Sequence, residues 1–471
     1  MRIELGRWLP VAAMVAFSGC ATYTSPFVHK SEAELDAMER RDELAAASFA
    51  AGDYDTAEKI VVELAEGPTV STPLYELERV SILLMKGESE KAHELMTKVR
   101  RDMDLVTDVK AEEEAASLWH GENEKVFKGD AHEKSTLYAL LALSYMERGE
   151  WEDAERCVKN GLLADSANTQ EARYNSDYAL LQYLGYAICK RSGNEDGAAE
   201  YLRELDALMG DGRERSKAFL ANLETPNAFL EVWAGKPPSY VRGGEYNEIR
   251  YVVPGYGSPF SFLSASCMGQ EYLIQQGLAD INFQAKTRGG REMDSVLQDK
   301  ASVKSGMEAS GNILLVMGFA MVAAANGGTE GDMILLCVGG GCIVAGGVFH
   351  VVGACINPDA DVRYWKNLPG EFLIVPLVLP EGEHAITVNG YKLWDNVAKK
   401  TARLSTGGEG VAVRHLSLMN YGRQLASPLG TIYTESGAVS DAADLPFSKD
   451  LPAEITPAKE QSSGPEKGAA Q

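Results

Sequence analysis

Residues 135–168 read STLYALLALSYMERGEWEDAERCVKNGLLADSAN, and this stretch decides the predicted fold of the amino-terminal half. Apolar side chains recur at helical spacing on both sides of a central glycine: Tyr138, Leu141, Ala142 and Tyr145, then Ala154, Val158 and Leu162. Gly149 permits a tight turn between two helices, where a Cβ atom can clash. Ala154 is small where the helices cross, and Tyr145 and Trp151 are expected to fill the gap between neighbouring helical hairpins.

The same arrangement recurs along the amino-terminal half. A glycine is followed two positions on by an aromatic or small residue, and five positions on by an alanine, at Gly52, Gly87 and Gly149. Gly193 keeps only the alanine. The step from Gly52 to Gly87 is 35 residues, and a period of about 34 residues is typical of tetratricopeptide repeats, abbreviated TPR.

The pattern resembles a TPR-like helical array over residues 38–225. Gly161 and Ser166 stand where this repeat class prefers Ala and Pro. Residues 103–129 are expected to form an irregular insert or a degenerate hairpin, because the step from the second glycine to the third is nearly two periods. Stacked hairpins of this class form a curved surface that binds peptides or helices. A plain helical bundle with glycine turns is the alternative.

The carboxyl-terminal half, residues 226–440, has a different pattern. Short β-branched or aromatic runs, punctuated by Gly, Pro and Asn, predict strands: residues 229–233, 249–253, 372–378, 385–388 and 411–416. Glu381-Gly382 and Asn389-Gly390 are expected to be turns of an antiparallel sheet. Residues 270–325 are expected to be mainly helical. The fold class is therefore α+β and multidomain, with a disordered tail at residues 441–471.

Residues 309–356 contain two uncharged stretches that flank Glu330-Gly331-Asp332. Small residues recur every seven positions in both: Gly311, Gly318 and Ala325, then Gly339, Gly346 and Gly353. Seven residues are close to two helical turns, so each set lies on one face and lets two helices approach closely. We expect an apolar, Gly-rich helical hairpin, buried over the sheet or in an oligomer contact. Membrane insertion is the alternative, because the second stretch is long enough to span a bilayer.

The amino terminus resembles the signal of a bacterial lipoprotein. A basic start precedes an apolar run at residues 8–17, which is too short to span a membrane. Cys20 follows Ser18-Gly19 as in the lipobox, where the thiol is joined to diacylglycerol and the new amino terminus is acylated. Ala21 resembles the class held in the outer membrane, facing the periplasm. The resemblance implies a signal peptide and a lipidated linker: residues 1–19 and 20–37.

Charge and cysteine content exclude several kinds of partner. A formal net charge of −23 repels nucleic-acid phosphates, so we expect no nucleic-acid role.

Six cysteines remain after Cys20: Cys157, Cys189, Cys267, Cys337, Cys342 and Cys355. The periplasm permits disulfides, and six cysteines allow fifteen pairings, so the pairing stays open. Small buried apolar side chains are the interpretation that we favour. No CxxC and no Cys/His cluster with zinc spacing occurs, so we expect no metal and no cofactor.

Most of the mature chain resembles a family of bacterial lipoproteins with tetratricopeptide repeats whose biochemical role is not established. Three pieces carry the resemblance: GENEKVFKG at residues 121–129, GLADIN at residues 277–282, and DADVRYWKNLP at residues 359–369 followed by PEGEH at residues 380–384. The Gly-rich hairpin before Asp361 is more apolar than the family leads one to expect. Relatives are often encoded near activators of peptidoglycan synthases, which implies a cell-envelope partner.

Arg363 and Trp365 are two residues apart in the third of these segments. On a strand they share a face, with the guanidinium free for stacking or for an acidic partner. We favour a structural corner instead, where Leu368-Pro369 leads into the strand at residues 372–378.

Motifs that carry catalysis are missing from the sequence. It contains no GxSxG, HExxH or P-loop, and no GxGxxG opens a helix after a strand. We therefore expect no catalytic residues and a scaffold that binds periplasmic or envelope proteins through the repeats. Two alternatives are a membrane-inserting or membrane-remodelling component and an unrecognised periplasmic hydrolase. The oligomeric state stays open.

Overall fold

The computed structural model describes residues 32–67, 69–105, 126–166, 176–209, 225–287, 292–325, 330–355, 359–392, 395–420, 431–433 and 439–441. Cys20, the predicted signal at residues 1–19, and most of the predicted insert and tail lie outside these residues. The chain divides into two compact units, Met1–Gly422 and Arg423–Gln471. In the second unit, β11 (Thr431–Tyr433) and β12 (Val439–Asp441) pair antiparallel.

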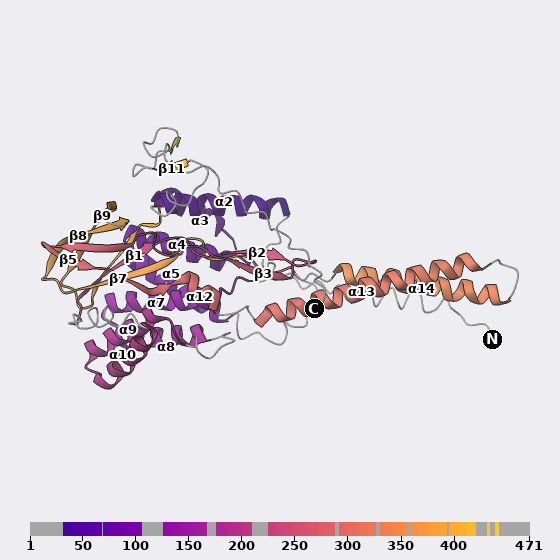
Figure 1. Cartoon of the computed structure of the whole chain (residues 1–471), viewed down its shortest axis with the longest axis horizontal. Coiled ribbons are helices and arrows are strands. Elements are labelled where there is room, and N and C mark those ends of the chain that lie inside the picture. Colours follow the sequence, from indigo (N-terminus) through magenta and orange to yellow (C-terminus); the bar gives the residue numbers. More distant parts are fainter. Residues whose placement is uncertain are drawn as a thin grey trace, which may run out of the picture. The chain divides into compact units, whose positions relative to one another are not determined.

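The amino-terminal part of the first unit is helical (Figure 1). Its described helices form four consecutive pairs: α2 (Glu32–Ala51) with α3 (Tyr54–Leu64), α4 (Thr72–Lys86) with α5 (Ser89–Leu105), α7 (Ala131–Glu147) with α8 (Trp151–Ser166), and α9 (Ala179–Ser192) with α10 (Glu195–Met209). The glycines singled out by the sequence lie at the turns inside these pairs: Gly52, Gly87, Gly149 and Gly193.

Each of these turns uses the same backbone geometry. The four glycines have φ angles of 87°, 77°, 74° and 73°, a left-handed conformation that glycine adopts easily. The residue after each glycine donates its N–H to the carbonyl five residues earlier, as Glu150 does to Tyr145. The alanine five positions after each glycine is buried: Ala57, Ala92, Ala154 and Ala198. The repeated sequence spacing therefore reflects one turn geometry used four times.

The carboxyl-terminal part of the first unit contains the sheets. One sheet has the strand order β10 (Ala412–Ser417), β1 (Ala228–Ala234), β7 (Glu371–Leu377) and β6 (Gln275–Asp280). A second has the order β5 (Gln270–Leu273), β4 (Phe262–Cys267), β8 (Gly382–Lys392) and β9 (Asp395–Thr406). A ribbon is formed by β2 (Ser239–Gly243) and β3 (Ile249–Val253). The chain is thus mixed, with helices first and sheets after them, as predicted.

Strand β1 lies between two hydrophobic cores. Phe229 and Trp233 belong to the core shared with the helices, whereas Leu230 and Val232 belong to a core with the second sheet. Successive side chains of a strand point to opposite faces, and every residue of β1 is buried. Helices therefore cover one face of the first sheet, and the second sheet covers the other.

Two local predictions are wrong. Residues 270–280 were expected to be helical but form β5 and β6, and helix α12 begins only afterwards (Ile281–Thr287). Pairing with β4 and β7 overrides a weak local preference. Asn389-Gly390 lies inside β8 and not at a turn. A Cβ atom on Gly390 would lie 2.7 Å from the Phe260 ring, so a close ring requires this glycine.

Helices α13 (Glu292–Ala324) and α14 (Glu330–Cys355) lie side by side (Figure 1). A Cβ atom on Gly318 would lie 2.7 Å from the carbonyl oxygen of Gly339. One on Gly346 would lie 2.8 Å from the carbonyl oxygen of Gly311. The two backbones therefore touch at two levels that lie seven residues apart. At such contacts Cα–H groups commonly approach carbonyl oxygens.

The outer surface of this helix pair is apolar and exposed. Only 11% of the apolar window in each helix is buried, over Lys304–Ala324 and Asp332–Val351. Large exposed side chains occur along both helices: Ile313, Val316, Phe319, Ile334, Val344 and Val351. The expectation that these residues are buried over the sheet is therefore wrong, because their own chain leaves them uncovered.

Candidate functional site

The predicted array residues lie where α7 and α8 meet neighbouring helix pairs. The half-buried Tyr145 ring packs edge-on against His93 of α5, with 4.7 Å between ring centroids. Trp151, at the start of α8, lies under the guanidinium of Arg191 of α9, 5.5 Å from the ring centroid. Each ring thus contacts a different neighbouring pair.

Arg363 and Trp365 do not lie on a strand, because residues 359–370 are irregular. Trp365 is fully buried, and its indole N–H donates to Oγ of Ser81 in α4 at 2.9 Å. The guanidinium of Arg363 turns back on Asp361, with Nε 2.8 Å from Oδ1. Both side chains therefore bind other residues of the same chain. We call residues 361–367 the docking segment.

Buried carboxylates on α2 and α4 bind the docking segment. Glu78 accepts the backbone N–H of Lys366 at 2.5 Å and that of Asn367 at 2.9 Å. Asp42 forms an ion pair with Lys366, with 2.6 Å between Oδ2 and Nζ. These donors compensate carboxylates that have lost their water. The contacts join the helical and sheet parts of the chain.

Glu133 on α7 provides the third carboxylate of this surface. Its Oε2 accepts the backbone N–H of Asp130 at 2.6 Å, as part of the capping box that starts α7. Its Oε1 accepts the backbone N–H of Trp365 at 2.6 Å. One side chain thus starts a helix and holds the docking segment. We call Asp42, Glu78 and Glu133 the carboxylate row.

The buried position changes the acidity of the carboxylate row. Burial raises the pKa of Glu78 well above its ordinary value, and the charge of Asp42 raises it further. Burial also raises the pKa of Asp42, although Lys366 opposes this effect. Burial by itself lowers the pKa of Lys366, but Asp42 and Glu78 more than offset it and the pKa is raised. The three groups therefore depend on one another for their charge.

A further ion pair ties the β2–β3 ribbon to the start of α7. The guanidinium of Arg250 donates to both oxygens of Asp130, at 2.9 Å and 2.6 Å. It also lies 3.4 Å from the centroid of the Tyr240 ring. Bidentate pairs of this kind fix orientation as well as charge. These contacts therefore fix the position of the β2–β3 ribbon against the helices.

Sequence reasoning missed the carboxylate row. A signal was present in α4, where Glu78 falls among the apolar positions Leu74, Leu77 and Ile82 of a buried helix face. A charged residue in such a face usually has a partner, because burying it alone is costly. The partner is supplied by residue 366, nearly 300 positions later, which no local pattern shows.

The first sheet carries another buried polar cluster. Oε2 of Glu231 in β1 lies 2.6 Å from Nδ1 of His415 in β10 and accepts the indole N–H of Trp233 at 2.8 Å. Parallel pairing of the strands sets the two residues opposite each other. Among the described residues Oε1 of Glu231 has no hydrogen-bond partner. The pair is buried, so we infer that it helps to fix the register of the two strands.

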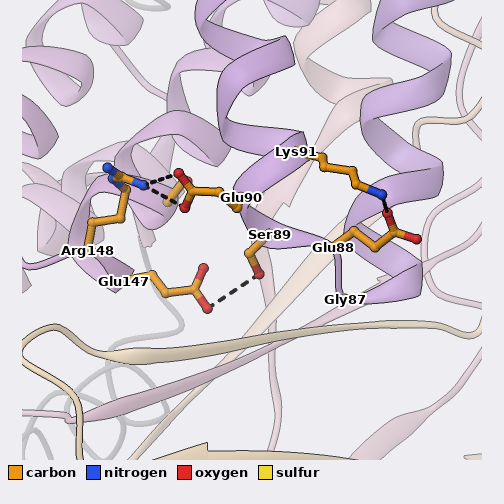
Figure 2. A pocket seen from close by; sticks show the side chains of 8 residues that line it. Gly87, Glu88, Ser89, Glu90, Lys91, Glu147 and Arg148 are labelled. Atoms are coloured by element: carbon orange, nitrogen blue, oxygen red, sulfur yellow. Dashed lines mark hydrogen bonds and ion pairs between the residues drawn. The ribbon is translucent and has the colours of Figure 1, made fainter.

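A polar pocket of about 610 Å³ opens beside the α4–α5 turn and the end of α7 (Figure 2). Charged and hydroxyl side chains dominate its lining: Gly87, Glu88, Ser89, Glu90, Lys91, Ser144, Glu147 and Arg148. Lys91 pairs with Glu88 at 2.6 Å, and Arg148 pairs with Glu90 at 2.6 Å. The charges of these four side chains are therefore already matched inside the pocket.

Glu147 differs from the other carboxylates of the pocket. It accepts a long hydrogen bond of 3.4 Å from Ser89, and burial raises its pKa. Nearby, Oγ of Ser144 lies 2.9 Å from Nδ1 of His93, whose pKa is lowered by burial. The carboxylate and the imidazole therefore contact different hydroxyl groups. The arrangement suits binding of a polar segment better than activation of one serine.

The remaining side chains with possible chemistry are dispersed. In the described part of the chain, no three His, Cys, Asp or Glu side chains gather as ligands of a metal ion. Cys157, Cys189 and Cys267 are buried free thiols, and burial raises the pKa of Cys157 to about 11. Cys337 is free and exposed on α14, which differs from the expected burial. No family model and no curated protein matches the chain, so its function is inferred from its own geometry.

Proposed function

We propose that the protein is a lipid-anchored scaffold of the bacterial outer membrane, which faces the periplasm and binds other envelope proteins. It attaches to the membrane twice, through acyl chains on Cys20 and through a helical hairpin made by α13 and α14. The helix pairs of residues 38–225 are a TPR-like array in this proposal. The protein is not an enzyme and needs no cofactor.

The exposed apolar surface of α13 and α14 carries the membrane part of the proposal. Val316 and Val344 are 69% and 57% exposed, and each lies near the middle of an uncharged section of its helix, residues 309–324 and 333–355. Contiguous apolar patches of this size are rare on soluble monomers and mark interaction sites. A bilayer would remove this surface from water, and helices of about 20 apolar residues have the length that it requires.

The signal-like amino terminus supports the attachment through acyl chains on Cys20. One acyl chain gives only marginal binding, whereas two or three chains on Cys20 give stable anchoring. The resemblance to a lipoprotein family and the residue Ala21 support the outer membrane as the location. The same resemblance is the basis for a partner related to peptidoglycan synthesis.

Burial within the chain limits which surface of the proposed array is open to partners. The carboxylate row is covered by the docking segment, and Trp365 is fully buried there. This face therefore cannot also receive a peptide without displacing the protein's own chain. The polar pocket lined by Glu147 and Arg148 is open, and we propose that partners bind there.

Membrane extraction tests the hairpin independently of the lipid. The variant Cys20→Ala should remain in the membrane fraction after carbonate extraction. Adding Val316→Asp and Val344→Asp should release it, because an Asp at the centre of an inserted helix costs about 2.5–3.5 kcal/mol. Leu163→Asp is the matched control, since Leu163 is 71% exposed on α8. Full release of Cys20→Ala alone would refute a second attachment.

Pull-down from envelope extracts tests the scaffold. The full mature chain is required, because a fragment ending at residue 225 lacks the docking segment and exposes the carboxylate row artificially. A partner of the pocket should be lost with Glu147→Lys and retained with Arg203→Glu, an exposed position on α10. Equal recovery with both variants would place the partner surface elsewhere.

A further inference from the structure

The two apolar helices are joined in one antiparallel register. The glycine contacts pair position 311 with 346 and position 318 with 339. Following the same register, Ala325 lies level with Asp332. At the other end, the His350 ring reaches Asn312, with 3.1 Å between Nε2 and Oδ1. The polar or charged positions of the helix pair therefore occur at two levels, one at each end of an uncharged section.

The distance between these two levels approaches the thickness of a membrane. A rise of about 1.5 Å per residue places Ala325 about 20 Å from Asn312 along α13, and Asp332 about 27 Å from His350 along α14. The hydrocarbon core of an average bilayer is about 30 Å thick, and bacterial outer membranes are thinner than average. The uncharged section of α14 thus approaches the thickness of a thin bilayer, and that of α13 is shorter.

The base of the helix pair is polar and tied to the rest of the first unit. Glu308 accepts a hydrogen bond from the Tyr246 hydroxyl at 2.8 Å, and Nζ of Lys304 lies 5.0 Å from the centroid of the same ring. Tyr and Lys side chains are favoured where a helix leaves the hydrocarbon, because a polar tip there meets headgroups and water. This end therefore suits the near membrane surface.

No polar face would allow the pair to lie flat on a membrane. Between the two levels, residues 313–325 and 333–349 contain no charged side chain. The exposed side chains cover the outer arc of α14 from Met333 to Phe349, and the remaining arc faces α13. A helix that lies in the interface needs a polar side toward water. This geometry disfavours the interfacial position.

We propose that α13 and α14 cross the bilayer completely, so that Ala325 and Asp332 emerge on the surface opposite the helical and sheet parts. The inference rests on the proposed membrane insertion and adds its depth and topology. In the outer membrane, Ala325 and Asp332 then face the cell exterior. The acidic group of Asp332 remains among headgroups and water at the end of insertion, where a charge costs least.

Labelling of cysteines in cells tests this topology. A maleimide carrying a polyethylene glycol chain too large for the outer membrane is added to intact and to permeabilised cells, and labelled peptides are identified by mass spectrometry. Three positions in the full chain report depth: Ala325→Cys at the far level, Ser310→Cys at the near level, and the native Cys337 between them. Both substitutions are small changes at positions that are not buried.

We expect Ala325→Cys to react on intact cells, Ser310→Cys to react only after permeabilisation, and Cys337 to stay unlabelled in both. Labelling of Ala325→Cys only after permeabilisation, with Cys337 still protected, would refute the crossing while leaving membrane insertion intact. If Cys337 reacts after permeabilisation as readily as Ser310→Cys, the hairpin is outside the bilayer and the membrane part of the proposed function fails as well.

Discussion

The contact around the carboxylate row and the α13–α14 helix pair are organised in opposite ways. In the first, charged and polar groups are buried, and each carboxylate meets an N–H or an ammonium group from the docking segment. In the second, glycines are buried and large apolar side chains face outward. The carboxylate row has hydrogen-bond partners inside the protein, whereas the α13–α14 pair exposes apolar side chains that the rest of the protein does not cover.

This difference shows which parts of the chain are complete by themselves. The buried carboxylates need no further partner, because their oxygen atoms already accept hydrogen bonds. Removing a donor would leave a carboxylate oxygen with fewer partners and no water to replace them. The exposed apolar surface of the helix pair is unfavourable in water, because its free energy falls when an apolar partner or a bilayer covers it. The proposed membrane role follows from that second property.

The largest effect is expected from breaking the docking contact. Trp365→Ala should lower the free energy of unfolding by about 3–5 kcal/mol, the cost of truncating a fully buried aromatic side chain. Urea unfolding of the purified mature chain measures it. Tyr251→Ala serves as the control, since its ring is half exposed on β3 and the change should cost well under 1 kcal/mol. Equal losses in the two variants would mean that the docking segment contributes no special stability.

The next effect concerns the glycine contacts of the helix pair. Gly318→Leu should separate α13 from α14, because the new side chain meets the Gly339 carbonyl, and overpacking of this kind costs about 1–3 kcal/mol. Gly340→Leu is the matched control, since no atom lies within 4 Å of its Cβ position. Spin-label distances between the helices report the separation. A pair that stays together in both variants would contradict the close backbone contact.

Acidity should distinguish the carboxylate row from ordinary surface acids. The pKa values of Asp42 and Glu78 are raised above 3.8 and 4.5, mainly by burial. Their protons therefore stabilise the fold fully below those values, and this stabilisation is lost as pH rises through the raised pKa values. The loss is at most about 1.4 kcal/mol per pH unit for each group.

Asp42→Asn tests this pH dependence. The variant lacks one titrating group and also removes the charge that raises the pKa of Glu78, so its stability should fall less between mildly acidic and neutral pH. Urea unfolding over that range compares the two proteins. Parallel curves for the variant and the native chain would show that the row is not the source of the pH dependence.

The smallest effect is expected at the turns of the helix pairs. Gly149→Ala should cost about 1–2 kcal/mol, because its φ of 74° is strained for a residue with a Cβ atom. Gly408→Ala is a control without contacts near its Cβ position and without a left-handed φ. Thermal unfolding of both variants measures the difference. Equal midpoints would indicate that the turn relaxes to accept alanine.

Local patterns predicted the parts of the fold that depend on local physics. Gly149 and Ala154 belong to a turn whose hydrogen bonds span only five residues, so their spacing is visible in the sequence. The seven-residue spacing of Gly311 and Gly318 indicated a close helix contact for the same reason. Runs of β-branched and aromatic residues marked β1, β3, β7 and β10.

Features that depend on distant residues escaped prediction. The strands at residues 270–280 form because β4 and β7 pair with them, although their own sequence favours neither state strongly. Glu78 is buried only because Lys366 and Asn367 reach it. Arg363 and Trp365 were expected at a structural corner, and residues 359–370 are indeed irregular, but nothing local shows that the docking segment lies against α4.

The central claim is that α13 and α14 belong in a bilayer, and vesicle flotation of the non-acylated chain beginning at Ala21 tests it most directly. Vesicles of phosphatidylethanolamine and phosphatidylglycerol are mixed with the folded protein in detergent, the detergent is removed, and the mixture is centrifuged through a density gradient. We expect this chain to float with the vesicles and the Val316→Asp and Val344→Asp double variant to stay at the bottom. A folded native chain that stays at the bottom with its double variant would show that α13 and α14 do not insert.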